Sequence, residues 1–268
     1  MDDQGGVADE GSNISASIIL GTLNECENIS GFIHQLQEVL GKSHNFEIIV
    51  VDDGSTDGTI EKLTQLAAAD GRVIPVFNKD RRGLLASNLQ GIAIAKGDYK
   101  VVMDSDWQHP PEKLPNIVEN LEKGNDVVIC SRYIAGGNVG GRNGLRGLIS
   151  HVATFMGKIA LRNKKPVQDN ISGYFGFRKE IRVPKPQGGN GFKTLLYLLA
   201  LNPQANVIEI PYGFRQRKAG QSKIVSTWRF IPRYLIEIMN VARLSYRSRR
   251  EYKSLYSQAG GNLQTERN

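Results

Sequence analysis

Apolar runs and amphipathic stretches alternate along the chain. Short runs rich in β-branched residues stand at 17–20, 46–51, 73–77, 99–103, 126–130 and 207–210. Between the first five runs, apolar residues recur at helical spacing near 27–40, 57–69, 84–96 and 112–123. In the third stretch, Leu85, Leu89, Ile92 and Ala93 share one face. This alternation predicts an α/β fold with a mostly parallel sheet covered by helices on both faces.

The second half of the chain is less regular. Glycine-rich residues 136–147 predict a loop, a Pro- and Gly-rich segment follows at 183–191, and residues 214–223 (FRQRKAGQSK) are basic around a glycine. From 227 to about 258 the pattern is helical again. We expect an acidic disordered tail at 1–14, one domain over 15–226 and a basic amphipathic helical tail over 227–268.

The basic tail is the segment most suited to a membrane surface. Residues 228–268 hold eight Lys or Arg and three Glu, with the arginines interleaved among aromatic and apolar side chains such as Trp228, Phe230 and Tyr234. This composition is typical of a helix at a membrane interface. The alternative is a helix packed on the domain with a solvated basic face. The longest apolar run, 195–201, is far shorter than the roughly 20 residues of a spanning helix, so we expect no integral span.

Charge and cysteine content narrow the partners. The net charge of +7 favours an anionic partner, which is nucleic acid, anionic lipid or a phosphorylated substrate. Cys26 and Cys130 lack metal-ligand spacing and do not indicate a disulfide framework. We expect both to be buried thiols.

Polar residues follow four of the predicted strands directly. The segments are GTLNE, DDGSTDGT, DSDWQH and SRY. Because ligands bind beyond the carboxyl ends of parallel strands, these segments predict an active-site rim. The charged residues gathered there are Glu25, Asp52, Asp53, Asp104, Asp106 and Arg132.

The pair Asp104 and Asp106 is the strongest chemical signal. Residues two apart at the end of a strand point to the same side, so both carboxylates can face one ligand. Hard oxygen ligands suit Mg²⁺ or Mn²⁺ bound together with substrate phosphates, and no His- or Cys-rich cluster supports zinc. Gln108 is a further candidate ligand. His109 is expected to shape the turn before two prolines rather than to act in catalysis.

The segment after the second strand has two readings. Ser55, Thr56 and Asp57 are helix-capping residue types. Asp52 or Asp53 at the strand end can accept hydrogen bonds from a base or a ribose. The chain has neither a P-loop nor a G-x-G-x-x-G fingerprint after the first strand.

These motifs together resemble family 2 glycosyltransferases of the GT-A fold. SIILGTLNE, EIIVVDDGSTDGT, GDYKVVMDSDWQHPPE, SRY, SGYFGFRK and FRQRKAGQSK stand in that family's order over about residues 15–225. They look most like the dolichol-phosphate mannose synthase and polyprenyl-phosphate glycosyltransferase group. The resemblance implies a GT-A catalytic domain over 15–226.

The resemblance also implies roles for individual residues. It implies that the metal on the nucleotide diphosphate is bound by Asp104, Asp106 and Gln108. It implies that the nucleotide sugar is bound by Thr22, Leu23, Glu25, Asp53, Asp104 and Ser105. It implies that the acceptor phosphate is bound by Arg132, Arg146, Arg217, Ser222 and Lys223. The catalytic residues implied are Asp106 and Arg132. Asp169 and Ser172 match the family's motif more weakly. The family usually has Pro and Tyr in the first motif, where this chain has Gly21, Thr22 and Leu23, so the base is left open.

The implied reaction explains why few acid–base residues are present. A lipid phosphate is already a nucleophilic anion at neutral pH, so no general base is required. The metal stabilises the leaving diphosphate and arginines orient the attacking phosphate. The resemblance implies inverting transfer of a hexose, first of all mannose from GDP-mannose, onto dolichyl or another polyprenyl phosphate at the cytoplasmic face of a membrane. UDP-glucose or another UDP-sugar is the alternative donor, and a membrane-anchoring subunit is a possible partner.

Two other classes of protein remain as rivals. A non-catalytic basic scaffold would bind nucleic acid, but the aspartate-rich rim repels phosphate unless a metal intervenes, so we expect no nucleic acid partner. A nucleotidyltransferase would carry a Gly-rich loop with Lys or Arg after the first strand, and GTLNE has no basic residue.

Overall fold

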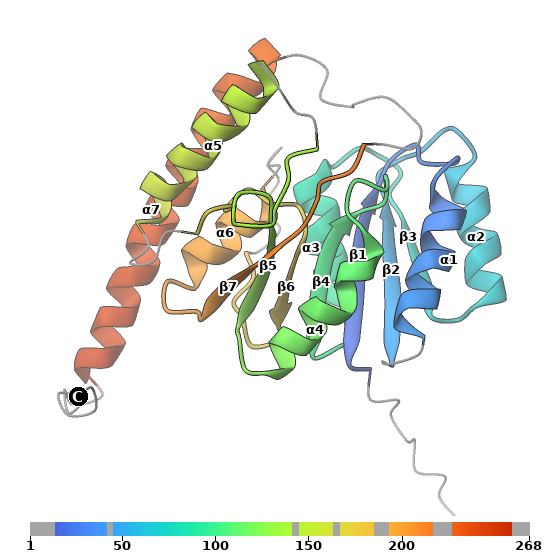
Figure 1. Ribbon diagram of the computed structural model, residues 1–268, viewed down its shortest axis with the longest axis horizontal. Coiled ribbons are helices and arrows are strands. Elements are labelled where there is room, and N and C mark those ends of the chain that lie inside the picture. Colours follow the sequence, from blue (N-terminus) through green and yellow to red (C-terminus); the bar gives the residue numbers. More distant parts are fainter. Residues whose placement is uncertain are drawn as a thin grey trace, which may run out of the picture.

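A seven-stranded sheet forms the centre of the protein. The computed structural model describes residues 14–41, 45–140, 145–162, 167–184, 193–216 and 227–258. The strands lie in the order β3-β2-β1-β4-β6-β5-β7 and helices cover both faces (Figure 1). They are β1 (Ala16–Thr22), β2 (Phe46–Asp52), β3 (Val73–Phe77), β4 (Tyr99–Asp104), β5 (Val127–Ser131), β6 (Phe175–Arg178) and β7 (Val207–Pro211).

Six of these strands confirm the hydrophobic pattern to within two residues at each end. The seventh, β6, was not predicted, and it runs antiparallel to both β4 and β5. Its Phe175 and Phe177 are buried on one face of the sheet. Gly176 between them faces α4 (Leu114–Glu122), where a Cβ would collide with Ile117. A four-residue strand with a central glycine carries too little pattern to be recognised in advance.

The helices fall into two groups, one on each face of the sheet. One face carries α1 (Ile29–Leu40), α2 (Thr59–Ala69) and α4, the last preceded by a short 3₁₀ turn. The other face carries α3 (Leu84–Ile94), α5 (Leu145–Leu161), α6 (Thr194–Leu201) and α7 (Thr227–Gln258). Strand residues alternate between the two cores, with Ile18 in the first and Ile19 in the second.

Helix α3 shows how closely the helical pattern is realised. Leu85, Leu89 and Ile92 are buried against the sheet as the pattern predicts, whereas Ala93 is exposed. Gly91 lets the helix approach β1, because a Cβ there would lie 2.6 Å from Ile19. The helix therefore rests directly on the strand that leads into the first motif.

The long helix α7 packs against α5 and α6, and it continues past α5 toward the C-terminus (Figure 1). The Tyr234 hydroxyl donates to the carbonyl oxygen of Ala153 at 2.7 Å, and the Ser245 hydroxyl donates to that of Leu161 at 2.9 Å. Within the described residues, no helix has the length and apolar character needed to cross a bilayer.

Candidate active site

The strand ends that carry the polar motifs lie at one edge of the sheet. Thr22 at the end of β1 is level with Asp52 of β2, and Gly21 is level with Asp104 of β4. Because β6 is antiparallel to both of its neighbours, β5 runs parallel to β4 and brings Ser131 to the same edge. The sheet topology thus brings together the four polar segments that were predicted to form an active-site rim.

A turn, rather than strand alternation, positions the two aspartates. Strand β4 ends at Asp104, and Asp106 lies in the bend that follows, where the next residue, Trp107, has a φ of 66°. The Asp104 side chain is 36% exposed. Asp106 is 4% exposed, and the backbone N–H of Gln108 donates to its Oδ1 at 3.1 Å. The turn therefore holds one carboxylate open and the other within the protein.

The buried ring of His109 supports this turn, as predicted. The backbone N–H of Asp104 donates to Nδ1 of His109 at 3.0 Å, which assigns the proton of the neutral ring to Nε2. That nitrogen lies 3.9 Å from Oδ2 of Asp104. The ring stacks on Tyr174 at a centroid distance of 5.2 Å. A Cβ at Gly173 would lie 3.0 Å from the ring, so this neighbour has to be small.

The first motif, residues 21–25 (GTLNE), is hydrogen-bonded to the start of α2. Glu25 is 7% exposed, its Oε2 accepts from the Asn28 amide at 2.7 Å, and its backbone N–H donates to Thr59 at 2.9 Å. The hydroxyls of Thr22 and Ser105 lie 3.3 Å apart. They link the first motif to the turn at 104–109, which we name the aspartate turn. Leu23 is half-buried beside them.

The two aspartates after β2 organise loops. Oδ1 of Asp52 accepts from the backbone N–H of Gly54 at 3.1 Å and of Ser55 at 2.9 Å. Asp53 accepts from the backbone N–H of Arg82 at 2.7 Å and of Gly83 at 3.0 Å, one with each oxygen. The carboxylate of Asp53 therefore holds the turn that starts α3.

Arg132 forms a buried ion pair. Its Nε and Nη2 each lie 2.7 Å from an oxygen of Asp169, and the two residues are 7% and 0% exposed. Burial opposes the charged form of Arg132, but the hydrogen bonds and charge of Asp169 outweigh it, so the pKa of the guanidinium is raised. The backbone N–H groups of Gln168 and Asp169 donate to Glu209 at 2.7 and 2.9 Å.

Sequence reasoning gave Asp169 little weight and missed Glu209. These contacts join residues 37 and 40 or 41 positions apart, and no local pattern marks them. An invariant spacing across relatives would be the kind of signal that finds such a pair.

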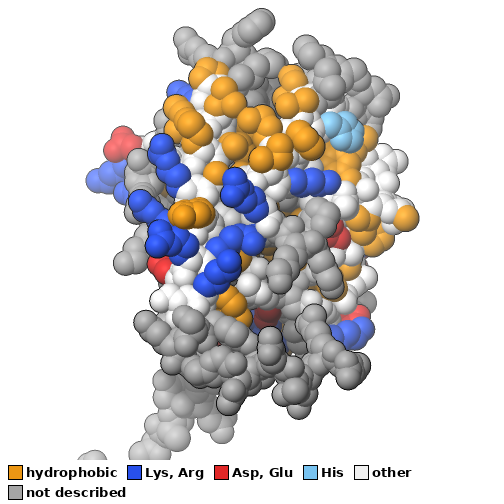
Figure 2. All heavy atoms as spheres, turned by 90° about the vertical axis from the view of Figure 1, so that its left-hand side faces the viewer, with side chains coloured by type: hydrophobic (Ala, Val, Ile, Leu, Met, Phe, Trp, Pro, Cys, Tyr) orange, Lys and Arg blue, Asp and Glu red, His pale blue; other side chains and the backbone are white. Residues whose placement is uncertain are grey.

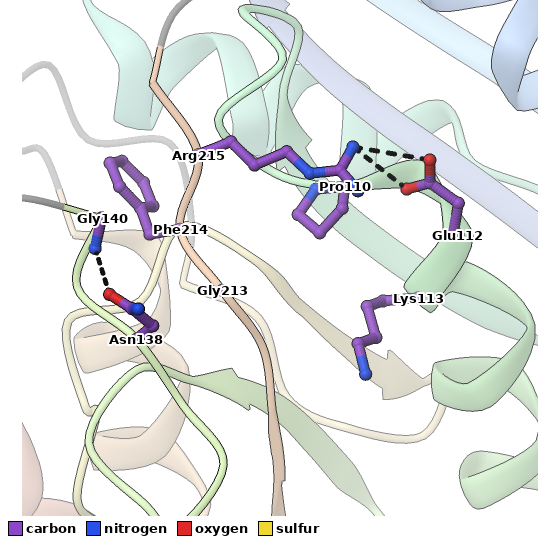
Figure 3. Close-up of a pocket in the computed structure, with 8 residues that line it drawn as sticks. All are labelled: Pro110, Glu112, Lys113, Asn138, Gly140, Gly213, Phe214 and Arg215. Atoms are coloured by element: carbon purple, nitrogen blue, oxygen red, sulfur yellow. Dashed lines mark hydrogen bonds and ion pairs between the residues drawn. The ribbon is translucent and has the colours of Figure 1, made fainter.

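A cavity of about 320 Å³ lies beside the aspartate turn, lined by Pro110, Glu112, Lys113, Asn138, Gly140, Gly213, Phe214 and Arg215. Figure 3 shows Arg215 reaching toward Glu112, with the closest atoms 3.4 Å apart. The backbone N–H of Arg215 donates to the carbonyl of Gln108 at 3.1 Å, and the Gln108 amide donates back at 3.4 Å. The described segment that ends at residue 216 is thus hydrogen-bonded to the aspartate turn through Arg215.

Several of the predicted acceptor residues lie outside this description. Arg217, Ser222 and Lys223 are outside the described residues. Arg146 lies in the first turn of α5, whose bounds are described although this side chain is not. Arg215 is the last described arginine before these residues, and it is hydrogen-bonded to Gln108 at the rim.

The family model for glycosyl transferase family 2 matches residues 17–182. The chain belongs to this family. It is therefore a glycosyltransferase, and the family resemblance found in its motifs is confirmed.

Curated relatives fall in one group of these enzymes. The dolichol-phosphate mannosyltransferase of Pyrococcus furiosus is 37% identical over 212 residues, which cover 79% of this chain and 59% of the archaeal protein. The enzyme of that name from Saccharomyces cerevisiae is 32% identical over 79% of this chain and 82% of its own length. The polyprenol monophosphomannose synthase of Mycolicibacterium smegmatis is 32% identical over 77% and 80%.

Solved structures show that the glycosyltransferase has the GT-A fold. Glucosyl-3-phosphoglycerate synthase from Mycobacterium tuberculosis aligns with a TM-score of 0.59 and 20% identity over 87% of this chain and 80% of its own. A mannosyltransferase from Pyrobaculum calidifontis, in complex with GDP-Man and Mn²⁺, aligns with a TM-score of 0.55 and 15% identity over 92% and 76%. The predicted fold class is confirmed.

The candidate metal ligands of this glycosyltransferase fit a divalent cation that also binds a substrate. Asp104, Asp106 and Gln108 offer carboxylate and amide oxygens, which Mg²⁺ and Mn²⁺ prefer. Across the described part of the chain, no cluster of three or more His, Cys, Asp or Glu forms a complete protein cage. A site with two carboxylates suits a metal that takes its remaining ligands from a diphosphate and water.

Proposed function

We propose that this glycosyltransferase transfers mannose from GDP-mannose to a polyprenyl phosphate such as dolichyl phosphate, with inversion at the sugar carbon and with Mg²⁺ or Mn²⁺. The observation that carries the proposal is 37% identity over 79% of the chain to a protein named dolichol-phosphate mannosyltransferase. The aspartate turn at the sheet edge and the basic segment fastened to it supply the two charges that this reaction requires.

The donor side of the reaction is assigned to the aspartate turn. Asp104, Asp106 and Gln108 hold the metal on the nucleotide diphosphate, and the hydrogen bond from Gln108 to Asp106 keeps that carboxylate in one orientation. When bound there, the metal neutralises the charge of the leaving diphosphate. Thr22, Leu23, Glu25, Asp53 and Ser105 surround the nucleotide sugar.

The acceptor side is assigned to the arginines. Arg132 cannot swing freely, because Asp169 accepts from both Nε and Nη2, so it presents a fixed positive group at the end of β5. Arg146, Arg217, Ser222 and Lys223 complete the phosphate site. The lipid phosphate is an anion that attacks the sugar carbon directly, so the proposal needs no residue to remove a proton.

The lipid acceptor requires contact with a membrane, and one face of the protein suits it. On α5 and α7 the residues Val152, Phe155, Ile159, Leu235, Ile236 and Met239 are 44–62% exposed. Exposed cations follow on α7 at Arg233, Arg243, Arg247, Arg250 and Lys253. Figure 2 shows the apolar side chains gathered at one end with Lys and Arg next to them. These eleven residues form what we name the docking face.

The docking face supports peripheral binding to an anionic membrane surface. Contiguous apolar side chains are costly to leave in water, and cations beside them are attracted to anionic lipid headgroups. We propose that it rests on the cytoplasmic side of the membrane that carries the acceptor. A membrane-anchoring subunit is the alternative occupant, and binding to lipid vesicles without other protein distinguishes the two.

UDP-glucose is the second candidate donor. The first motif lacks the family's tyrosine, so the stacking contribution of that ring is absent and does not decide between guanine and uracil. The decisive test incubates the purified protein with polyprenyl phosphate vesicles, Mn²⁺ or Mg²⁺ and a panel of nucleotide sugars, and detects lipid products by mass. We expect a hexosyl lipid from GDP-mannose in large excess over the other donors. A product from UDP-glucose alone would move the donor assignment, and nucleic acid binding with no lipid product would overturn the proposal.

A further inference from the structure

A second cavity, of about 290 Å³, lies on the α5 side of the rim. Its lining is Tyr133, His151, Thr154, Phe155, Lys158 and Gln168. Four of these residues come from one stripe of α5, since positions 151, 154, 155 and 158 follow the spacing of a single helix face. None of them belongs to the metal, nucleotide or acceptor-phosphate residues assigned above.

One wall of this cavity leads toward Arg132. The guanidinium carbon of Arg132 lies 5.2 Å from the centroid of the Tyr133 ring. Gln168, on another wall, precedes Asp169, which holds two nitrogens of Arg132. A phosphate bound at Arg132 would therefore be separated from the cavity by about the width of one aromatic ring.

The opposite side of the cavity leads to the docking face. Phe155 lines the cavity and is 62% exposed, and His151 beside it is also exposed. Val152 and Ile159, which are 50% and 57% exposed, flank Phe155 on the outer surface of α5. The cavity thus lies between the acceptor-phosphate residues and the surface that we assign to the membrane.

The hydroxyl and ammonium groups on the cavity wall are engaged within the protein. The Lys158 ammonium donates to the Gln168 side chain at 2.7 Å, and the hydroxyls of Tyr133 and Ser150 lie 2.8 Å apart. The Thr154 hydroxyl donates to the backbone carbonyl of Ser150 at 2.9 Å. Aromatic rings, a methyl group and the methylenes of Lys158 are left as the surface for a ligand, which favours an apolar occupant.

We infer that this cavity binds the isoprene units of the lipid acceptor that lie next to its phosphate. At roughly 30 Å³ for a group of the size of a water molecule, a cavity of about 290 Å³ accommodates about ten carbons, which is two isoprene units. The inference rests on the proposed function, because it takes the acceptor to be a prenyl phosphate whose anion lies at Arg132.

The test uses the full chain, without vesicles, and soluble prenyl phosphates of one, two and three isoprene units. In the wild-type protein the acceptor KM should fall about tenfold or more from one unit to two, because each buried methylene group favours binding. It should change little from two units to three, because the cavity is then full.

Phe155→Ser and Ile159→Ser form a matched pair for this test. Both residues are exposed on α5, one helical turn apart, but only Phe155 lines the cavity. Phe155→Ser should lose most of the dependence on chain length while keeping its Tm. Ile159→Ser should keep the wild-type dependence.

The outcomes separate the two proposals. No transfer by the wild-type protein to any prenyl phosphate would overturn the proposed function itself. Transfer with a KM that does not depend on chain length would overturn the cavity assignment alone. Equal loss of the dependence in Phe155→Ser and Ile159→Ser would also overturn it, since general surface apolarity would then be responsible.

Discussion

The edge of the sheet and the docking face are built in opposite ways. At the edge, Glu25, Asp53 and Asp106 are only 4–7% exposed, and each accepts hydrogen bonds from the protein. On the docking face, Phe155 and Ile236 are 62% and 56% exposed, and arginines stand among such side chains. The edge is an arranged group of anions, whereas the docking face is apolar surface that is exposed among the described residues.

The difference teaches how charge is divided in this enzyme. Buried carboxylates that accept hydrogen bonds from the protein are held in one orientation, and under the proposed function this would prepare the edge for a cation and its diphosphate before either binds. Exposed apolar groups flanked by cations have no such geometry and suit a surface that is itself fluid. If the proposed function holds, the donor binds a fixed acidic edge and the lipid binds an exposed basic surface.

Helix α7 has one side that is buried against the domain and one side that belongs to the docking face. Tyr234 and Val241 on its inner side are 4% and 0% exposed, and the Glu237 carboxylate accepts the backbone N–H of Lys193 at the start of α6 at 3.1 Å. Ile236 and Met239 on its outer side are 56% and 50% exposed. Deleting α7 would uncover α5 and α6, so the membrane role is tested by substitutions on its outer side.

The largest expected effect concerns the acidic edge. Asp104→Asn and Asp106→Asn should each reduce transfer by about 10²–10³-fold, because each removes a charged oxygen ligand of the proposed metal, which stabilises the leaving diphosphate. Circular dichroism and Tm should stay near wild type. Asp98→Asn is the matched control, since its exposed side chain lies just before β4 and pairs with Lys179. Near-normal transfer by either Asp104→Asn or Asp106→Asn would contradict the assignment.

Removing the metal should act on the same side. Calorimetry of GDP binding should show affinity about a hundredfold weaker in excess chelator than in Mn²⁺, which corresponds to about 2.7 kcal/mol, because a bound cation neutralises part of the diphosphate charge. Asp106→Asn should bind GDP weakly in both conditions. If the wild-type protein binds GDP equally well in chelator, the edge is not a metal site.

The docking face should respond to salt in a way that the edge does not. Each arginine near an anionic bilayer contributes about 1 kcal/mol, so Arg243→Gln with Arg247→Gln should weaken vesicle binding by about thirtyfold at low salt. Ile236→Ser with Met239→Ser should weaken it at every salt concentration, because apolar burial is not screened. Co-sedimentation with anionic vesicles measures both. Binding by both double variants at the wild-type level would place the membrane contact elsewhere.

The smallest effect expected is on the acceptor phosphate. Arg217→Ala and Lys223→Ala should each raise the acceptor KM by about tenfold, from the loss of about 1.5 kcal/mol of charged hydrogen bonding. The affinity for GDP should be unchanged. A weaker GDP affinity with an unaltered acceptor KM would assign these residues to the donor side instead.

The sequence predicted the fold well where one short pattern decides it. Six strands, four helices and the long C-terminal helix follow from apolar spacing, and the helix ends at Gln258 as expected. Strand β6 and helices α5 and α6 were missed. The first is four residues long, and the second follows a glycine-rich segment that predicts only a loop. Cys130 is buried as expected, whereas Cys26 is half-buried.

The site was less predictable because its supports come from distant parts of the chain. Strand alternation was the reason given for grouping Asp104 with Asp106, but a bend beyond β4 holds the second aspartate. The pairing of Arg132 with Asp169 and the support from Glu209 depend on β5, β7 and the 167–169 turn lying together. Such contacts follow from the folded sheet and not from local spacing.

The central claim is that the lipid phosphate displaces the metal-held diphosphate in one step, with no covalent sugar–enzyme stage. A single displacement inverts the sugar carbon, so GDP-mannose, whose mannose is α-linked, must give a β-linked mannosyl phosphate. The direct measurement is the one-bond carbon–proton coupling at the anomeric carbon of the product lipid, determined by NMR. We predict the β anomer alone, and an α-linked product would contradict the account.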